Sequence, residues 1–440
     1  MAMSASTGDL GPPPAPRALS RQDARTLALA ALGGALEFYD FIIFVFFTSV
    51  IGQLFFPPDT PDWLRQLQAF GLFAAGYLAR PLGGIVMAHF GDRTGRKRMF
   101  TLSVFLMAVP TLLIGLLPTY ETLGYAAPLC LLGLRILQGA AVGGEVPGAW
   151  VFVSEHVPER RIGFACGTLT AGLTFGILLG SLMATAVNKA YDQEALLAFG
   201  WRIPFLIGGV LGFFSVFLRR WLAETPVFEE MRQRRALVKE LPLKAALRGH
   251  GLSVAVSMLL TCVLTAGIVV VILMTPTLLQ KLYGIPATAA LEANSLATLS
   301  LTIGCVSAGL LSDRFGASRV LSIGMLAQLG ATYLLYRGAS ATPEHLPLLY
   351  VVTGLCVGVT GAIPGVMVRA FPPPVRFSGL SFSYNMAYAL FGGLTPLLVT
   401  LLLKASPMAP AHYVAGMCAL GSLIALFLPA LSRRAQHQSE

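Results

Sequence analysis

Long apolar segments alternate with short polar ones between residues 26 and 431. Each apolar segment holds about 20 residues or more, enough for a helix to cross a bilayer core of roughly 30 Å. Backbone groups in lipid must be paired within the spanning element, so we expect these segments to be helices. The pattern predicts an all-α membrane protein with twelve transmembrane helices. Their predicted ranges are 26–53, 67–90, 97–117, 125–153, 162–188, 202–221, 251–280, 287–311, 319–336, 346–370, 376–403 and 409–431.

The polar connections divide these spans into two groups of six. The longest connection of the spanning region is 219–250, and a short motif recurs on either side of it, as GDRTGRKR at 91–98 and SDRFGASR at 312–319. Parallel repeats of this kind are typical of two-lobed membrane transporters. We therefore predict a disordered cytoplasmic tail at 1–25, an N-terminal half at 26–221, a cytoplasmic linker at 222–250, a C-terminal half at 251–431 and a cytoplasmic tail at 432–440.

The charged residues indicate how the chain is oriented. Only 12% of residues are charged, against about 25% in soluble domains. The net charge is +10, and 23 of the 31 Lys and Arg fall in segments on the same side of the membrane as the N-terminus. This bias places both termini in the cytoplasm. It indicates a multi-pass protein of the cell (inner) membrane whose basic residues set its topology, with no role in binding nucleic acid.

Four charged residues interrupt the apolar spans of the N-terminal half. Glu37 and Asp40 lie roughly 16–21 Å into the first span, and Arg80 and Arg135 reach about the same depth. Each midplane charge costs about 2.5–3.5 kcal/mol to insert. We expect the two acids and two arginines to neutralise one another around a cavity. For Arg80 with Glu37, and also for Asp40 with Arg135, an ion pair that only fixes helix packing is the alternative.

These charges predict a mechanism of proton coupling. Burial and a nearby cation act in opposite directions on the protonation of a carboxyl group, so Asp40 would load or release a proton as its distance to Arg135 changes. The planar fork of an arginine also suits a substrate carboxylate, which would compete with Asp40. Gln138 lies one turn from Arg135 and is a further substrate-binding candidate.

The C-terminal half has no charge at midplane depth, so its candidates are polar and aromatic. Tyr384, Asn385 and Tyr388 lie in the eleventh span, and the two tyrosines share a helical face. We expect these three to bind the far side of a substrate. Aromatic residues in a span also serve as core, which is the alternative for the tyrosines.

Several motifs resemble those of the major facilitator superfamily, and within it the metabolite:proton symporters that carry citrate, 2-oxoglutarate, shikimate or betaine. They are LEFYDF at 36–41, ARPLGG at 79–84, GDRTGRK at 91–97, RILQGAAVGGE at 135–145, GWRIPF at 200–205 and FGGLTP at 391–396. The resemblance covers nearly the whole chain and implies the major facilitator fold. It also implies proton coupling through Asp40 and Arg135. From their depth and chemistry we add Glu37 as a proton-coupling candidate and Arg80 and Arg135 as substrate-binding candidates. In one departure, Arg369 stands where many members carry an acid.

The repeated loop motif predicts a gate on the cytoplasmic side. Its aspartates and arginines can cap helix ends and pair with the end of the fourth span. The residues we expect to act in gating are Asp92, Arg93, Arg96, Glu155, Asp313 and Arg314.

Together these features predict a secondary transporter and not an enzyme. It would move a small organic anion, first of all a di- or tricarboxylate such as citrate, with protons by alternating access. The alternatives are a zwitterion or hydroxylated monocarboxylate (betaine, proline or shikimate), or a uniporter or exchanger. No nucleotide-binding loop and no metal spacing occur in the sequence, so we expect no cofactor and no metal. We also expect the protein to be a monomer.

Overall fold

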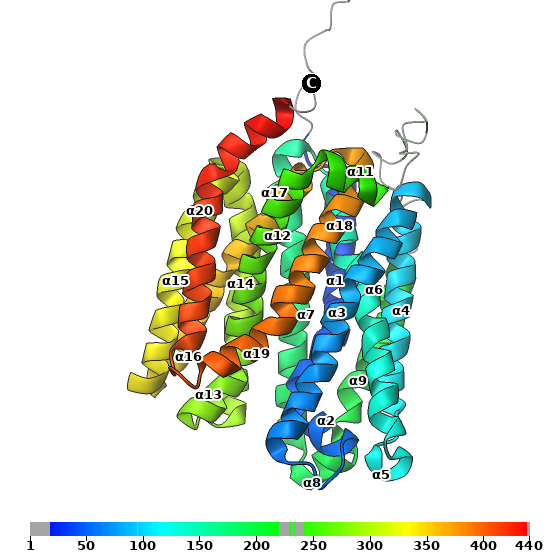
Figure 1. The fold of residues 1–440 in the computed structure, drawn as a ribbon, viewed down its shortest axis with the longest axis vertical. Coiled ribbons are helices and arrows are strands. Elements are labelled where there is room, and N and C mark those ends of the chain that lie inside the picture. The colour runs from blue at the N-terminus through cyan, green and yellow to red at the C-terminus, as the bar shows by residue number, and fades with distance from the viewer. Residues whose placement is uncertain (1–17, 95, 220–228, 230–232, 234–241, 438–440) are drawn as a thin grey trace, which may run out of the picture.

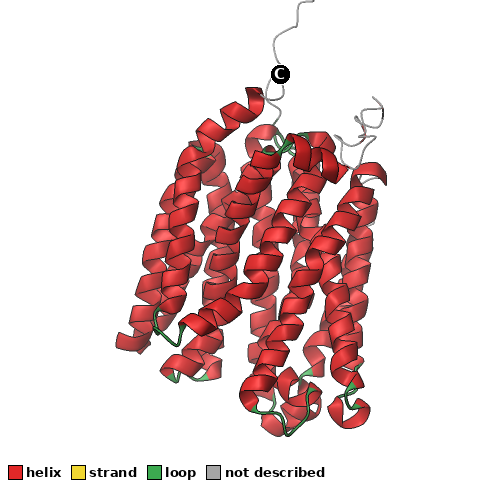
Figure 2. Ribbon diagram, in the orientation of Figure 1, coloured by secondary structure: helices red, strands yellow, loops and turns green. Residues whose placement is uncertain are grey.

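The computed structural model describes residues 18–94, 96–219, 229, 233 and 242–437. In this part of the chain, helices joined by short loops account for the fold and no strand occurs (Figure 2). The long helices stand side by side in a bundle (Figure 1). We call the end that carries α11 (Pro242–Gly249) the linker end. The opposite end carries α2 (Thr48–Phe55), α5 (Tyr120–Leu123) and α8 (Gln193–Ala195), and we call it the distal end.

The N-terminal half supplies one long helix for each predicted span. These helices are α1 (Arg21–Phe46), α3 (Asp62–Thr94), α4 (Arg96–Leu116), α6 (Ala126–His156), α7 (Ile162–Ala190) and α9 (Arg202–Arg219), with a π-helical turn at Leu196–Gly200. The first helix begins at Arg21, inside the predicted tail 1–25, because Ser20 caps it. The backbone N–H of Asp23 donates to Ser20 Oγ (3.1 Å), and the N–H of Ser20 donates to Asp23 Oδ2 (2.9 Å).

The C-terminal half differs in that three of its spans change helical type midway. In each of these, a π or 3₁₀ segment joins two α-helices end to end, as Pro and Gly in the sequence favour. The elements are α12 (Gly251–Thr265), η3 (Ala266–Met274), α13 (Thr275–Tyr283), α14 (Ala287–Phe315), α15 (Ala317–Ala341), α16 (Leu346–Val357), η5 (Gly358–Ala362), α17 (Ile363–Arg369), α18 (Arg376–Ala387), η7 (Tyr388–Gly392), α19 (Gly393–Leu402) and α20 (Ala409–His437). Residues 432–437 of the predicted tail are thus helical.

The helices have the length and composition of membrane spans. Ten helical segments of the described chain are long and apolar enough to cross a bilayer; α4 contributes a shorter apolar stretch, Thr101–Leu116, and α15 has 25 residues. Large apolar side chains remain exposed on the outside of the bundle, such as Leu82 at 68% and Ile323 at 70%. Lipid is the environment that such a surface fits.

Helix pairing repeats between the two halves, in the order of the spans. In the N-terminal half α1 packs on α7, α3 on α6, and α4 on α9. In the C-terminal half α12 packs on α18, α14 on α16, and α15 on α20. Each pair thus recurs six spans later, which agrees with the repeated loop motif.

Glycines bring the backbones of α3 and α6 into direct contact. A Cβ on Gly139 would lie 1.8 Å from the carbonyl oxygen of Gly76, and one on Gly83 would lie 1.9 Å from that of Ala140. No side chain fits at either position. The glycines of α3 and α6 therefore allow close packing of these two helices.

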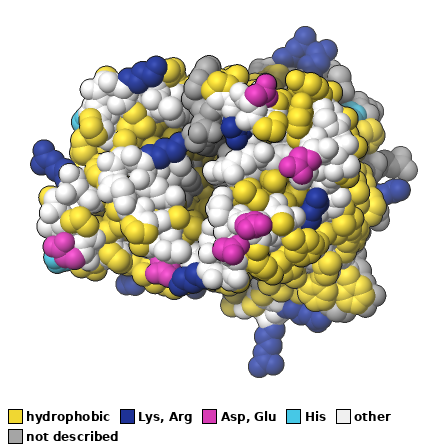
Figure 3. Space-filling model, turned by 90° about the horizontal axis from the view of Figure 1, so that it is seen from below, with side chains coloured by type: hydrophobic (Ala, Val, Ile, Leu, Met, Phe, Trp, Pro, Cys, Tyr) yellow, Lys and Arg dark blue, Asp and Glu magenta, His cyan; other side chains and the backbone are white. Residues whose placement is uncertain are grey.

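The two halves meet along α7 and α14, and again along α3 and α18. Gly163 and Gly309 face each other in the first contact, where a Cβ on Gly309 would lie 2.4 Å from the Gly163 oxygen. Seen from the distal end, scattered charged side chains lie among apolar and uncharged atoms, and a furrow separates the lobes (Figure 3).

We predict that Gly139→Ala destabilises the protein by about 1–3 kcal/mol or more, because its methyl group would overlap the α3 backbone. Gly133→Ala in the same helix is the matched control, since a Cβ there meets nothing within 4 Å. The control should leave the melting temperature in detergent unchanged or raise it, because alanine favours a helix interior over glycine. Equal melting temperatures for the two variants would contradict the packing argument.

Candidate functional site

Arg80 reaches from α3 across the boundary between the halves. Its side chain is fully buried, and Nε donates to Oδ1 of Asn385 in α18 at 3.3 Å. The guanidinium carbon lies 4.3 Å from the ring centre of Tyr388 and 5.2 Å from that of Tyr384. Nη1 and Nη2 have no hydrogen-bond partner among the described residues. Both are therefore available to an anion, in the fork geometry that suits a carboxylate.

The α6 backbone holds Asn385 in place. Its Nδ2 donates to the carbonyl oxygen of Gly143 (2.6 Å) and to that of Ser381 (2.8 Å). A Cβ on Gly143 would lie 2.1 Å from the oxygen of Arg80, so glycine is required for this approach. The bonds leave Oδ1 of Asn385 facing the arginine.

Aromatic rings from both halves surround the Arg80 guanidinium. Tyr77 and Tyr388 stack with ring centres 5.4 Å apart and planes 7° apart. Tyr384 lies 5.0 Å from Tyr388 and meets Trp150 edge-on at 4.9 Å. Gly392 permits the stack, because a Cβ there would lie 2.7 Å from Tyr388 and 3.3 Å from Tyr77.

A small cavity lies beside these rings, between the two halves. No charged residue occurs in its lining. Aromatic side chains, aliphatic side chains and threonines form the wall. The lining residues are Phe38, Trp150, Thr170, Leu173, Thr174, Ile177, Leu264, Ile268, Thr360, Tyr384 and Tyr388.

Arg135 occupies a separate position on α6, inside the N-terminal half. Its guanidinium carbon lies 4.7 Å from the Phe41 ring centre and 4.2 Å from that of Phe44. Nη1 donates to Gln138 Oε1 (2.8 Å) and to the Phe41 carbonyl oxygen (3.4 Å). Gln138 in turn donates to Thr111 Oγ1 at 2.7 Å. Nε and Nη2 of Arg135 have no hydrogen-bond partner in the part of the chain described.

The two acids of α1 do not pair with these arginines. Glu37 accepts a hydrogen bond from Ser215 Oγ of α9 at 2.9 Å. Asp40 is fully buried beside α9, where a Cβ on Gly208 would lie 2.6 Å from its Oδ1. The expected four-charge cluster is thus divided. The acids face α9, while the arginines are held by rings and amide oxygens.

The linker end carries an ion pair and a helix cap that join the halves. Glu155 at the end of α6 accepts from Arg376 of α18 at 3.1 Å. Asp313 at the end of α14 accepts from the backbone N–H groups of Gly163 (2.8 Å) and Phe164 (2.7 Å). Arg369 adds a contact to Asp313 at 3.4 Å. Asp313 therefore caps a helix of the opposite half.

The other predicted gating residues are placed differently. Arg314 points to the ring of its neighbour Phe315, with its guanidinium carbon 5.2 Å from the ring centre. In the described residues it makes no contact with the opposite half, because its side chain leaves α14 on another face than Asp313. The side chains of Asp92, Arg93 and Arg96 lie outside the described part of the structure.

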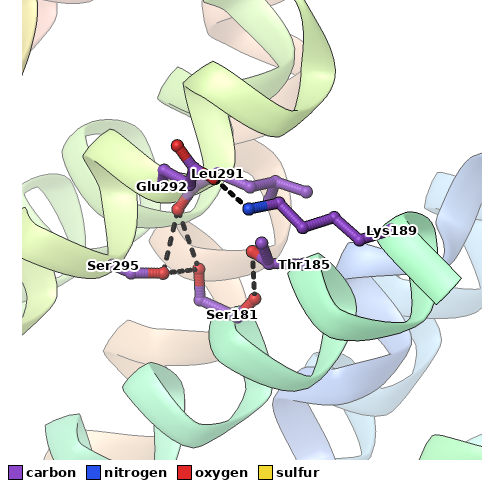
Figure 4. A network of polar contacts seen from close by, with 6 residues as sticks. All are labelled: Ser181, Thr185, Lys189, Leu291, Glu292 and Ser295. Atoms are coloured by element: carbon purple, nitrogen blue, oxygen red, sulfur yellow. Dashed lines mark hydrogen bonds and ion pairs between the residues drawn. The ribbon is translucent and has the colours of Figure 1, made fainter.

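The distal end has its own polar contacts between the halves, and a network of them lies between α7 and α14 (Figure 4). Lys189 forms an ion pair with Glu292. Farther along α7 from the distal end, the hydroxyl groups of Ser181 and Ser295 form a hydrogen bond of 2.9 Å. The α7–α14 interface is thus tied at both ends.

Sequence reasoning expected six substrate-binding residues, of which Arg80, Tyr384, Asn385 and Tyr388 lie together, whereas Arg135 and Gln138 bond to each other elsewhere. It missed Trp150, because one tryptophan in an apolar segment carries no polar signal. It also missed Arg376 as the partner of Glu155. No group of three His, Cys, Asp or Glu side chains that could hold a metal occurs among the described residues.

Comparison with known proteins agrees with this architecture. The chain is similar to the "Putative proline/betaine transporter" of Staphylococcus aureus (strain MSSA476), with 32% identity over 92% of this chain and 88% of that protein. It is also similar to the "Citrate-proton symporter" of Klebsiella pneumoniae, with 31% identity over 90% of this chain and 89% of that protein.

A solved structure of the proton:xylose symporter XylE, bound to 6-bromo-6-deoxy-D-glucose, has the same fold. The TM-score is 0.77 at 17% identity, and the match covers 93% of this chain and 95% of that one. Residues 30–309 match the Major Facilitator Superfamily. The chain therefore belongs to the Major Facilitator Superfamily, a family of membrane transporters and not of enzymes.

Proposed function

We propose that the protein is a proton-coupled symporter of a small organic zwitterion, such as betaine or proline. The observation that carries this proposal is the position of Arg80, whose two free donors lie beside a charge-free aromatic cavity. A carboxylate would bind the Arg80 fork. The cationic nitrogen of the same molecule would enter the cavity lined by Phe38, Trp150 and the two tyrosines.

Cation–π attraction gives a physical reason for this assignment. Ring faces carry partial negative charge, so a cation among several desolvated rings gains about 2 kcal/mol or more. A second carboxylate in the same place would meet those faces with the wrong sign. The name of the Staphylococcus aureus relative supports the same class of solute.

A di- or tricarboxylate is the second candidate. Arg135 is a second buried cation with free donors, at Nε and Nη2, and the Klebsiella pneumoniae relative is named for citrate. Binding one substrate to both arginines would require the Phe41 ring to move, because it lies between Arg135 and Tyr77. That requirement makes the zwitterion the first candidate.

We assign proton coupling to Asp40, with Glu37 as an accessory acid and with Arg135, which bonds to the carbonyl oxygen of the adjacent Phe41, as the cation. Asp40 is fully buried, and its carboxyl oxygens have no hydrogen-bond partner among the described residues. A buried carboxyl group without donors is stable only when it is neutral or when water reaches it. Loading and release of a proton would therefore follow changes in hydration between the two open states.

Alternating access would use the contacts between the halves at each end. In the proposed cycle, the Glu155–Arg376 pair and the Asp313 cap on α7 close the linker end. Lys189 and Glu292 close the other. The distribution of Lys and Arg supports a cytoplasmic linker end with both termini on that side.

The substrate class is tested by uptake into proteoliposomes with a panel of labelled glycine betaine, proline, citrate and tricarballylate. We expect betaine or proline to accumulate under an imposed pH gradient and to be lost on adding a protonophore. Phe38→Leu should weaken uptake of that zwitterion about tenfold, or about 1.4 kcal/mol, because the cavity loses one ring face. Leu173→Ile in the same wall is the control and should change it little. Accumulation of citrate alone would select the second candidate.

Coupling is tested by Asp40→Asn, which cannot ionise. This variant should lose gradient-driven accumulation while retaining exchange of labelled for unlabelled solute. Glu37→Gln should have the smaller effect, because its amide oxygen can still accept the hydrogen bond from Ser215. Wild-type accumulation by Asp40→Asn would refute its role in coupling.

The linker-end contacts are tested by Asp313→Ala, which removes the acceptor for two α7 N–H groups. We expect cysteines introduced at the linker end of the central cavity to become more accessible to a membrane-impermeant label. Arg314→Ala is the matched control at the next residue, because Arg314 contacts only Phe315 within the described chain. Equal labelling in both variants would argue against a latch at Asp313.

A further inference from the structure

We propose that Tyr350 and Asn294 are positioning residues of the solute cavity, because they hold the π-helical segment η3 in the register that places Ile268 in the cavity wall. This inference rests on the proposed function, since it takes this cavity as the place of the solute's cationic end. Neither residue lines the cavity itself. Both would therefore determine which size of solute the protein accepts without touching the solute.

One carbonyl oxygen of η3 has no donor within its own helix. In an α-helix the N–H of Thr275 would bond to the oxygen of Val271, four residues back. Here it bonds to the oxygen of Val270, five residues back. The π register would offer Val271 the N–H of residue 276, but Pro276 has none. Because Val271 is fully buried, its carbonyl oxygen needs a donor from another helix.

Tyr350 of α16 supplies that donor. Its hydroxyl group donates to the Val271 carbonyl oxygen at 2.5 Å and also lies 2.8 Å from Oδ1 of Asn294 in α14. Both side chains are fully buried. The neighbouring carbonyl oxygen, that of Val270, receives Thr275 Oγ1 at 2.8 Å in addition to its backbone bond. A π segment is an uncommon conformation, and these side-chain donors stabilise it here.

The polar chain from η3 ends on the opposite half of the protein. Asn294 Nδ2 donates to Ser181 Oγ of α7 at 3.5 Å. Ser181 lies four residues after Ile177 on α7, and Val271 lies three residues after Ile268 on η3. Both isoleucines line the cavity. The chain therefore connects two walls of the cavity, one from each half, on the side toward the distal end.

Loss of the Tyr350 hydroxyl group would change the balance between two helical registers. Without it, the Val271 oxygen is unpaired in the π register, whereas an α turn would return the N–H of Thr275 to it. An α turn in place of the π turn rotates the preceding residues by about 100° relative to α13. Ile268 would then leave the wall, and the cavity would admit a bulkier solute.

The test measures the size selectivity of the full-length protein in liposomes. The labelled solute is glycine betaine, or proline if only that zwitterion accumulates, and the unlabelled competitor is N,N,N-triethylglycine, whose cationic end is bulkier. The measured quantity is the half-inhibitory concentration of the competitor divided by the KM of the labelled solute. A close-fitting pocket discriminates one methylene by about 10–200-fold, so we expect Tyr350→Phe to lower this ratio about tenfold. Lost stability alone would reduce the amount of active protein and leave the ratio unchanged.

Tyr413→Phe is the matched control. It removes a hydroxyl group that bonds to Thr395 Oγ1 at 2.7 Å, and Tyr413 does not line the cavity, so the wild-type ratio should persist. Asn294→Ala should lower the ratio in the same direction as Tyr350→Phe. The double variant should lower it no further than Tyr350→Phe alone, because both residues act through one hydroxyl group.

Ser181→Ala is a milder change that decides the matter if the larger ones prevent folding. It should lower the ratio less, because its bond to Asn294 is long. Thr185→Val is its control on α7, since that hydroxyl group bonds within the helix. Wild-type ratios in Tyr350→Phe and Asn294→Ala, or in Ser181→Ala where those two do not fold, would overturn the inference and leave the proposed function standing. If the wild-type protein accumulates neither zwitterion, the proposed function itself falls, and this inference falls with it.

Discussion

A buried arginine in a membrane must find partners for its donors without water, and the centre of this protein is built around two of them. A charge at this depth costs about 2.5–3.5 kcal/mol before it finds partners. Arg80 lies over Tyr388, and Arg135 lies between Phe41 and Phe44. Each also bonds to a side-chain amide, Asn385 or Gln138. Because neither is neutralised by an acid, each keeps free donors for an anion.

That solution requires helices to approach more closely than side chains normally allow. The rings and amides that hold Arg80 come from α3, α18 and the π segment after it, and they meet beside the glycine contacts of α3 with α6. Gly143 exposes the carbonyl oxygen that holds Asn385, and Gly392 leaves room for the Tyr77–Tyr388 stack. The glycines of these spans thus determine the site as well as the packing.

The sequence predicted the spans, since these depend on composition. Of the six expected substrate-binding residues, Arg80, Tyr384, Asn385 and Tyr388 lie together, whereas Arg135 and Gln138 lie apart from them. Charged residues are easy to identify in apolar segments. The guanidinium group of Arg80 does lie beside the rings of Tyr384 and Tyr388. The facing of α1 was not predictable, because this helix is apolar nearly all round and has no polar stripe to fix its rotation. Depth alone therefore suggested acid–arginine pairs. The glycine face of α9, which accepts Asp40, carries no charge and gave no signal.

Contacts along α7 and α14 link the two ends of the molecule mechanically. Asp313 caps α7 at the linker end, Lys189 and Glu292 pair at the distal end, and Thr174 bonds to Thr302 between them at 3.0 Å. The backbones touch at Gly163 and Gly309, so the helices cannot separate there without breaking the cap. Two helices tied at both ends and the middle can release one end most easily by pivoting about the middle. Such a pivot opens one end while pressing the other together, which is the geometry that alternating access needs.

In the proposed mechanism, a proton on Asp40 of α1 and a solute at Arg80 occupy separate sites, which Phe41 connects. Asp40 and Phe41 are adjacent on α1, and Phe41 contacts both Arg135 and Tyr77. Its carbonyl oxygen accepts from Arg135, and its ring meets Tyr77 edge-on at 5.2 Å. Tyr77 stacks on Tyr388, which covers Arg80. In this mechanism, a rotation of α1 that exposes Asp40 would also move the Phe41 ring that packs against Tyr77. Coupling in this arrangement needs no ion pair between the acid and either arginine, only a helix whose neighbouring residues face two different surroundings.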